Sequence, residues 1–196
     1  MTSLLTLWLL ASPDPALVEA LTALQRPRSV VANLEQTKTM RAFKRPQIAT
    51  GRLIVVPPRR VRWEYQSPYR AILVINGDKM SMEYPELGRK QVFDLSKDPA
   101  MKRVIDTILF FLEADANRVL ERFEVTATRQ EQHTVLALTP RSKTARGLVK
   151  RIEATVDRQR GVLTSLTIDE PDGDSTQLKL TNARTNEPVD ETLLTP

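Results

Sequence analysis

Apolar and polar residues alternate in short runs along most of the chain, and the runs end at proline, glycine or asparagine. Val61, Trp63 and Tyr65 are separated from one another by single charged residues, and Met80 and Met82 are separated by a serine. A two-residue period is typical of a strand with one buried face and one solvated face. Short strands that follow one another in this way indicate antiparallel pairing.

This pattern predicts eleven strands, separated by turns such as Pro57-Pro58, Asn76-Gly77 and the run from Pro171 to Asp174. The predicted strands span residues 29–39, 47–56, 60–66, 69–76, 79–84, 90–95, 123–130, 133–139, 147–158, 161–169 and 175–183.

The period of the apolar residues becomes helical in two regions, one near the N-terminus and one in the middle of the chain that contains two predicted helices. The first helix is predicted from Pro15 to Gln25, with Asp14 as its N-cap and proline in its first turn. One face carries Leu17, Leu21 and Leu24. A second helix is predicted after Asp98 and Pro99, and a third from Ala114 to Arg122. The apolar stripe of the second helix consists of Met101, Val104, Ile105, Ile108, Leu109 and Leu112.

Eleven twisted antiparallel strands in one small domain tend to bend into a barrel or half-barrel. A barrel that is left partly open needs a cover over its mouth, and the two amphipathic helical stretches are the available covers. The hydropathy pattern therefore predicts a hollow β structure with a helical lid, in the mainly β, α+β class.

The composition fits a folded domain that contains no cysteine chemistry. The chain has 196 residues, 41% of them hydrophobic and 27% charged, and no cysteine, so disulfides and thiolate sites are excluded. We expect a single domain over residues 15–196. Residues 1–14 are either a short secretory signal or an apolar N-terminal extension, because the apolar run from Leu4 to Ala11 is too short to span a bilayer.

Positive charge is concentrated near the N-terminus. Ten basic residues lie between Arg26 and Arg62 against one acid, Glu35, and the net charge of the whole chain is +5. Such a stretch attracts anionic lipid headgroups or an acidic protein partner, or is simply a solvated strand face. Nucleic acid is not expected as a partner, because aromatic side chains are not interleaved with the basic ones.

No residue pattern indicates catalysis. His133 is the only histidine and lies at a predicted hairpin turn, which excludes a histidine-rich metal site. Asp172 and Asp174 are explained as turn formers. We therefore expect a binding protein with no catalytic residue, metal or cofactor; a secreted hydrolase would have to depend on His133.

Several motifs, in their order and spacing from about Pro15 to Asn186, resemble the LolA family of periplasmic carriers of outer-membrane lipoproteins. The motifs are Leu34-Glu35-Gln36, Arg62-Trp63-x-Tyr65-x-x-Pro68, the run from Leu73 to Gly77, and the run from Leu136 to Pro140. The resemblance implies an unclosed eleven-strand antiparallel barrel with a helical lid, whose apolar interior accepts lipoprotein acyl chains. It also implies two protein partners, an inner-membrane exporter that loads the carrier and an outer-membrane receptor that unloads it.

The resemblance and the apolar faces together predict the site. The expected cavity residues are Leu53, Val55, Val61, Trp63, Met80, Met82, Ile105, Ile108, Leu109 and Leu112. The same residues are also explained as ordinary core. Leu17, Leu21 and Leu24 are expected on the lid. The run Ile72 to Ile75 is apolar on both faces of its strand, so the pattern alone does not say which side chains line a cavity.

Two positions depart from the family pattern. Pro57-Pro58 replaces the Arg-Pro pair whose arginine holds the lid closed in the family, so Arg59 or Arg60 is the candidate latch. Val61 replaces an aromatic residue. Two interpretations follow: a monomeric periplasmic lipoprotein carrier, or a related lipid-binding or lipid-sensing protein with another cargo.

Overall fold

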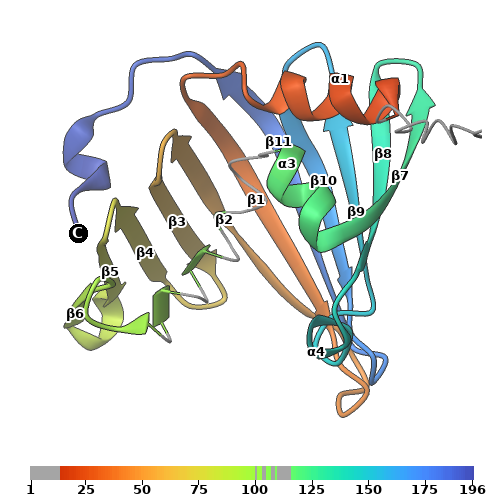
Figure 1. The fold of residues 1–196 in the computed structure, drawn as a ribbon. Helices are drawn as coiled ribbons and strands as arrows, with labels where there is room; N and C mark the ends of the chain where they lie inside the picture. Colours follow the sequence, from red (N-terminus) through yellow and green to blue (C-terminus); the bar gives the residue numbers. More distant parts are fainter. Residues whose placement is uncertain (1–13, 100, 103–104, 107–108, 110–115) are drawn as a thin grey trace, which may run out of the picture.

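Eleven antiparallel strands form one sheet that curls without closing (Figure 1). The computed structural model describes residues 14–99, 101–102, 105–106, 109 and 116–196. The strand order is β6-β5-β4-β3-β2-β1-β11-β10-β9-β8-β7, so β6 and β7 are its two edges. The strands are β1 (Val30–Thr39), β2 (Gln47–Val56), β3 (Arg60–Ser67), β4 (Ala71–Asn76), β5 (Lys79–Tyr84), β6 (Arg89–Asp94), β7 (Phe123–Gln130), β8 (His133–Pro140), β9 (Arg151–Asp157), β10 (Val162–Asp169) and β11 (Ser175–Thr185).

The sheet consists of two meanders, β1 to β6 and β7 to β11, which are joined where the first strand pairs with the last. In that junction Leu34 lies opposite Leu180, and Gln36 lies opposite Leu178. All other neighbours in the sheet are consecutive in the chain, so the β1–β11 pair alone brings the two meanders together into one curved layer.

Irregularities in strand pairing help the sheet to bend. The register shifts between Thr50 and Gly51 where β2 pairs with β3. A Cβ atom on Gly51 would lie 1.9 Å from the carbonyl oxygen of Glu64, so only glycine fits this close approach of two backbones. Further shifts occur in β1 between Val31 and Asn33 and in β10 between Leu163 and Ser165. Bulges of this kind increase the local twist and bend the strand.

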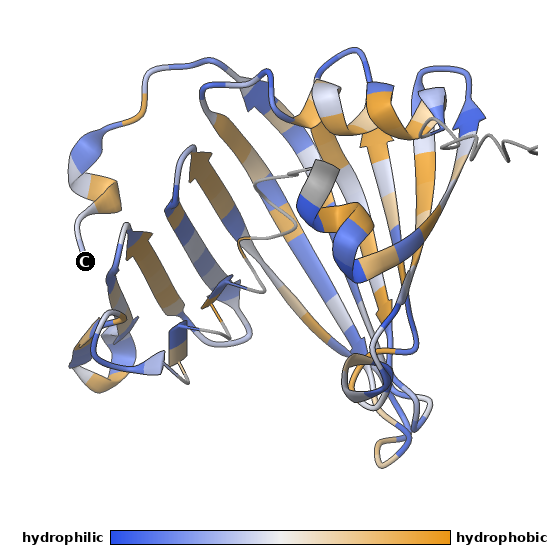
Figure 2. Ribbon diagram, in the orientation of Figure 1, coloured by the Kyte–Doolittle hydropathy of each residue, from blue (hydrophilic) through white to orange (hydrophobic). Residues whose placement is uncertain are grey.

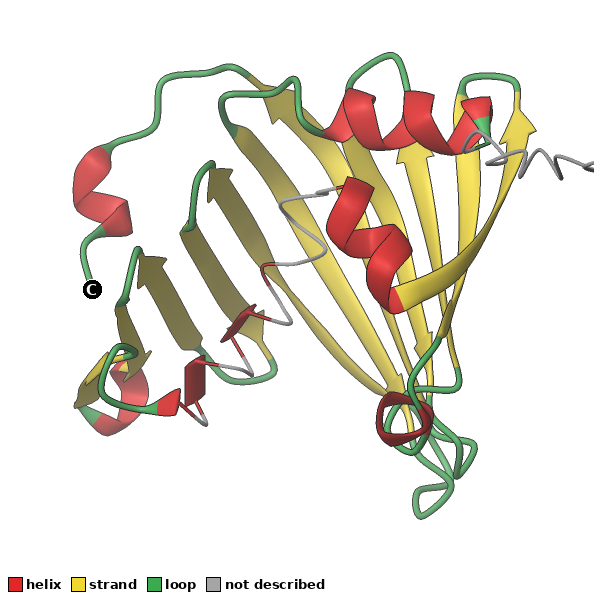
Figure 3. Cartoon of the chain, viewed as in Figure 1, coloured by secondary structure: helices red, strands yellow, loops and turns green. Residues whose placement is uncertain are grey.

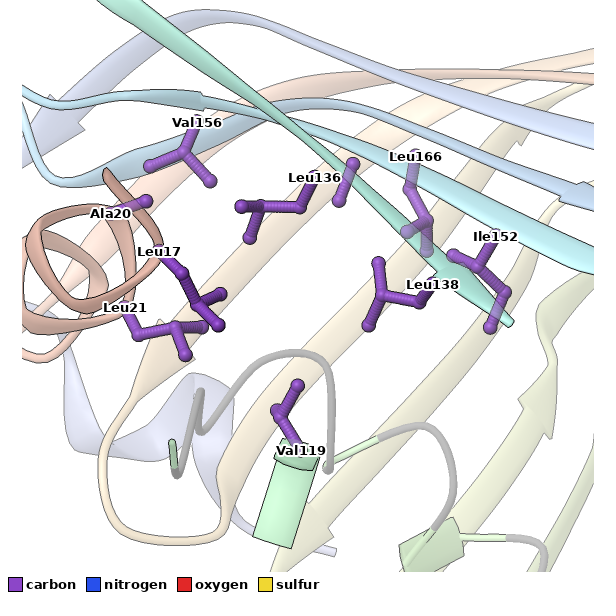
Figure 4. Packing of buried hydrophobic residues seen from close by; sticks show 10 residues of the cluster. Leu17, Ala20, Leu21, Val119, Leu136, Leu138, Ile152, Val156 and Leu166 are labelled. Atoms are coloured by element: carbon purple, nitrogen blue, oxygen red, sulfur yellow. The ribbon is translucent and has the colours of Figure 1, made fainter. Parts of the chain in front are cut away.

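Helix α1 (Pro15–Leu24) covers the β7–β11 half of the inner face, with α3 (Ala116–Arg122) beside it (Figure 3). The Asp14 carboxylate accepts a hydrogen bond of 2.8 Å from the Ala16 N–H, which caps the start of α1 as predicted. Leu17 and Leu21 are buried against strand residues such as Leu136, and Val119 of α3 packs on the same cluster (Figure 4). Leu24 is partly buried there.

A second helical stretch lies over the other half. We use "helical segment" for its described residues, Met101, Lys102, Ile105, Asp106 and Leu109. The Asp98 carboxylate accepts a 2.9 Å bond from the Met101 N–H, as expected for the predicted N-cap. Ile105 and Leu109 are fully buried against Leu95 and the inner side chains of β2 to β5.

The last residues return across the outer face of β2 to β4 and end in the short 3-10 helix η2 (Glu191–Leu194). Leu194 is 0% exposed and packs on Val31, Ile54 and Val56. Its carbonyl oxygen accepts a 3.2 Å bond from the Asn76 side chain. We call residues 187–196 the C-terminal strap.

The unclosed eleven-strand prediction is confirmed, and all eleven predicted strands are present. The largest boundary error is in the strand predicted from residue 147, which begins at Arg151, whereas the other predicted strand ends differ by at most two residues. Gly147 instead ends the short helix α4 (Lys143–Arg146), whose N-terminus is capped by the Ser142 hydroxyl. The 3-10 helix η1 (Pro85–Leu87) occupies a predicted turn. None of the helices described is long and apolar enough to cross a membrane.

Candidate binding cavity

An unbroken row of apolar side chains crosses the inner face of four strands. Leu53 of β2 lies opposite Trp63 of β3, Trp63 lies opposite Leu73 of β4, and Leu73 lies opposite Met82 of β5. All four side chains line one cavity with a volume of about 400 Å³. That volume lies within the range of about 300–1,000 Å³ typical of small-molecule sites.

The opposite wall comes from β1 and from β10 and β11 of the other meander. Leu34 and Leu180 are cross-strand neighbours, as are Leu178 and Leu166. These four residues line the same cavity, together with Leu163 and Ile168 of β10. The cavity therefore lies between two halves of the sheet that are far apart in the sequence, and its walls are almost entirely apolar.

Polar groups occupy one side of the cavity. The Tyr65 hydroxyl donates a 2.5 Å hydrogen bond to the Gln36 side-chain oxygen, and both residues line the cavity. Burial raises the pKa of Tyr65, and the neighbouring Trp63 indole partly opposes that increase. The two rings have centroids 6.0 Å apart, with their planes tilted by 56°. Tyr65 therefore stays protonated and hydrogen-bonded at neutral pH.

Five of the predicted cavity residues lie beside the cavity, in a closed core cluster. Val55, Val61 and Met80 are buried under Ile105 and Leu109 of the helical segment. Trp63 and Leu73 are partly buried against this cluster and also line the cavity. The cluster and the cavity are thus continuous, and the helical segment fills the part that would otherwise be open.

Arg59 joins the sheet to the helical segment. Its guanidinium donates a 2.9 Å hydrogen bond to the Asp106 carboxylate, and Lys102 donates a 3.1 Å bond to Asp78. Arg59 also lies 3.9 Å from Asp78. The backbone of Arg59 is left-handed, with φ 54°, an arrangement that costs energy for a residue other than glycine.

Arg60 points to a different partner. Its guanidinium forms a 2.9 Å ion pair with Glu191 of the C-terminal strap. The two adjacent arginines, both latch candidates from the sequence, therefore contact opposite sides of the sheet. Only Arg59 touches the helical segment.

The structure places three of the ten predicted cavity residues on the cavity wall: Leu53, Trp63 and Met82. Ile108 and Leu112 lie outside the described residues. Sequence reasoning missed Leu34, Tyr65, Leu73 and the whole wall from β10 and β11. Leu34 and Tyr65 alternate with polar residues in the sequence and Leu73 lies in a strand that is apolar on both faces, but which strands face one another depends on the long-range β1–β11 pairing.

No group of three or more histidine, aspartate or glutamate side chains in the described part of the chain is arranged to hold a metal ion. His133 begins β8 at the β7–β8 hairpin and is not among the residues that line the cavity. Its carbonyl oxygen accepts a hydrogen bond from Arg158.

Residues 25–196 match the family described as "Outer membrane lipoprotein carrier protein LolA". The chain belongs to the LolA family. It is 26% identical over 180 residues to the outer-membrane lipoprotein carrier protein of Chromohalobacter salexigens, a match that covers 92% of this chain and 79% of that protein. LolA-family carriers are periplasmic binding proteins without enzymatic activity, so this chain is a binding protein and not an enzyme.

Solved structures of the same fold support the assignment of the architecture. Lipoprotein LppX of Mycobacterium tuberculosis aligns with a TM-score of 0.52 and 16% identity, covering 91% of this chain and 99% of LppX. MucB aligns with a TM-score of 0.50 and 16% identity, and the match covers 92% of this chain and 61% of MucB. At these identities the similarity shows a shared fold alone.

Proposed function

We propose that this LolA-family protein is a periplasmic carrier that binds the acyl chains of lipoproteins in its cavity and moves them from the inner to the outer membrane. The apolar cavity between Trp63 and Leu178 is the observation that supports this proposal most directly. Its lining provides hydrophobic contact and few hydrogen-bonding groups, which suits a hydrocarbon chain better than a polar metabolite.

The binding energy available is large. Burial of each methylene contributes about 0.8 kcal/mol, so one long acyl chain contributes roughly 10 kcal/mol before any costs. A carrier that retained all of this energy could not release its cargo. Part of the gain must therefore be offset by a rearrangement of the protein.

The helical segment provides that rearrangement. Moving it away would join the core cluster around Val55, Val61 and Met80 to the cavity, and would enlarge the apolar space. The movement would break the Arg59–Asp106 ion pair and expose Ile105 and Leu109. Cargo binds more tightly to the open form but must shift the equilibrium towards it, so part of the binding energy is used in opening.

On this proposal Arg59 is the latch, and the helical segment with Ile105 and Leu109 is the moving part. Helix α1, with Leu17, Leu21 and Leu24, stays on the other half as a fixed cover. The protein partners are an inner-membrane exporter that delivers the lipoprotein and an outer-membrane receptor that accepts it.

A release assay tests the function. Purified protein is added to spheroplasts that carry the lipoprotein exporter and a newly made, labelled lipoprotein. We expect the lipoprotein to appear in the supernatant in a one-to-one complex with this protein. The Trp63→Glu variant should leave it on the membrane, whereas Val92→Glu, at an exposed position away from the cavity, should release it normally.

Two outcomes would contradict the carrier function. If the lipoprotein stays on the membrane while the protein copurifies with free lipid, the cavity belongs to a lipid-binding or lipid-sensing protein with another cargo. If Trp63→Glu releases lipoprotein as well as the wild type does, the cavity is not the cargo site.

A further inference from the structure

The exposed apolar side chains gather at one end of the sheet. This end, the lower end in Figure 1, is formed by the turns at residues 40–46, 68–70, 85–88, 141–150 and 170–174. Six of the eight large apolar side chains that stand exposed among the described residues lie in or next to these turns: Phe43, Ile48, Tyr69, Tyr84, Leu87 and Leu148. The described turns at the opposite end, such as 57–59 and 158–161, carry none.

The turn at 40–46 presents Phe43 in a fixed arrangement. The Asp174 carboxylate accepts a 2.9 Å bond from the Arg41 N–H, and the Arg41 guanidinium donates a 2.8 Å bond to the Asp172 carbonyl. These bonds hold the base of the turn against the β10–β11 turn. Phe43 is nevertheless 56% exposed, and it is followed directly by Lys44 and Arg45.

The loop at 141–150 repeats this combination. It contains four basic residues and no acid, and Leu148 is 71% exposed. Arg141 and Arg146 donate hydrogen bonds to backbone carbonyl oxygens, those of Phe123 and Pro140 among them. A carbonyl oxygen holds the guanidinium in place without neutralising its charge, so both charges remain available to an anionic surface.

The acidic β10–β11 turn lies between these two basic turns along the sheet edge. It contributes Glu170, Asp172 and Asp174, and the Asp172 and Asp174 carboxylates each accept a bond from a backbone N–H. Basic residues still outnumber acidic ones by seven to three across the turns at 40–46, 141–150 and 170–174. The pattern is thus two cationic points, each with one projecting apolar side chain.

We propose that this end of the sheet docks on the surface of an anionic phospholipid bilayer. Phe43 and Leu148 enter the headgroup region, the lysine and arginine side chains around them contact lipid phosphates, and Tyr69 and Tyr84 lie at the interface. Phe43 and Leu148 come from two turns that the β10–β11 turn separates along the sheet, and basic residues lie close to each of them, an arrangement that fits a lipid surface better than a protein partner. In Figure 2 the turns at this lower end are mostly hydrophilic, with short hydrophobic stretches among them.

Docking in this orientation has a consequence for the cavity. Gln36, Ala71, Tyr84 and Thr176 line the cavity and lie towards this end of their strands. The lower end of the cavity would therefore face the membrane surface. The docking itself does not depend on which cargo the cavity holds, so it can fail or succeed separately from the carrier function.

Vesicle cosedimentation tests the proposal. The wild-type protein is mixed at low salt with vesicles of phosphatidylglycerol and phosphatidylcholine, or of phosphatidylcholine alone. We expect binding to the anionic vesicles that weakens about tenfold or more at 0.5 M salt, because surface charges are then screened. We expect a similar loss of binding in each of two double variants. One combines Lys44→Glu with Arg45→Glu, and the other combines Phe43→Ser with Leu148→Ser.

Two controls separate docking from other causes. Val92→Ser removes an apolar side chain that is 60% exposed on edge strand β6, and it should bind vesicles like the wild type. Trp63→Glu should also bind them, because it alters only the cavity. Circular dichroism checks that each variant is folded. The proposal is overturned if the wild type does not bind anionic vesicles, a result that would favour a protein partner at this end of the sheet. It is equally overturned if the two double variants at Phe43, Lys44, Arg45 and Leu148 are folded and bind anionic vesicles as well as the wild type does, or if only Trp63→Glu loses binding.

Discussion

Strands β2 and β4 carry apolar side chains on both faces, yet the two faces of the sheet have different surroundings. On the outer face, Ile54 and Val56 are covered by the C-terminal strap, and Leu194 is completely buried. On the inner face, Leu53, Trp63 and Leu73 line a cavity of about 400 Å³. The same strands therefore carry a closed core on one side and an unfilled apolar space on the other.

The difference shows that apolar character does not by itself define a binding site. The outer face is closed because a distant segment of the chain packs onto it and is anchored by hydrogen bonds, such as the 2.7 Å bond from the Ser29 hydroxyl to the Glu187 carbonyl. Among the residues that the structure describes, none is seen to fill the inner face between its two walls in this way. Substitutions on the two faces should therefore affect different properties, stability on the outside and cargo binding on the inside.

The largest effect on stability is expected on the outer face. Leu194→Ala should lower the free energy of unfolding by about 2–5 kcal/mol, because it leaves a hole in a closed cluster. Chemical denaturation measures this loss, and cargo binding per folded molecule should stay unchanged. Leu193→Ala, at the half-buried neighbour, is the matched control and should cost less. Equal losses for the two variants would show that the strap is not packed as a core.

On the inner face, Trp63→Glu should reduce lipid affinity by about a hundredfold, equivalent to roughly 2.7 kcal/mol, because a carboxylate in the cavity would lose its hydration when an acyl chain enters. A fluorescent fatty acid titrated into the purified variant measures this change. The domain should stay folded, since Trp63 lies on a cavity wall. Met82→Glu, on the same wall, is a second variant with the same expected result. If both variants unfold, this wall is ordinary core.

A smaller effect is expected at the latch. Arg59→Ala removes the ion pair with Asp106, which lowers the cost of opening, so bound lipid should dissociate several-fold more slowly. Stability should change by less than about 1 kcal/mol, as for other partly exposed ion pairs. Stopped-flow lipid transfer to acceptor vesicles measures the rate. Arg60→Ala, which breaks only the contact with Glu191 on the outer side, should leave the rate unchanged; equal rates for both variants would rule out the latch.

The smallest effect concerns pH and the outer face. Burial disfavours the Glu64 carboxylate, but hydrogen bonds from Arg62 and Arg70 outweigh it and hold the pKa of Glu64 below its usual value. Glu64 therefore binds a proton more weakly in the folded protein than in the unfolded chain. Its contribution to stability is complete above the unfolded pKa of about 4.3 and is lost as pH falls through the lower folded pKa.

Glu64→Gln should accordingly be slightly less stable than the wild type at pH 7 and should lose less stability between pH 5 and pH 3. Urea denaturation across that range measures the difference in slope. An identical pH dependence of the two proteins would mean that the carboxylate does not stabilise the outer face through its ionised form.

The sequence by itself determined the local structure. Alternation and turn residues were sufficient to place the eleven strands, because side-chain direction in a strand and backbone preference in a turn are local properties. Capping predicted the starts of α1 and of the helical segment for the same reason. Local signals also misled once, since Gly147, Leu148 and Val149 look like the start of a strand. In the structure Leu148 is exposed beyond α4, where its apolar character suits a docking surface better than a core.

Only the tertiary structure decided which apolar residues form the cavity. Leu73 belongs to the wall because its register places it opposite Trp63. Val55, Val61 and Met80 belong to the core because the helical segment covers them. The second wall depends on the pairing of β1 with β11, and the closed outer face depends on the strap. Each of these is a contact between residues far apart in the chain, and a periodic pattern shows which residues share a face but not what that face meets.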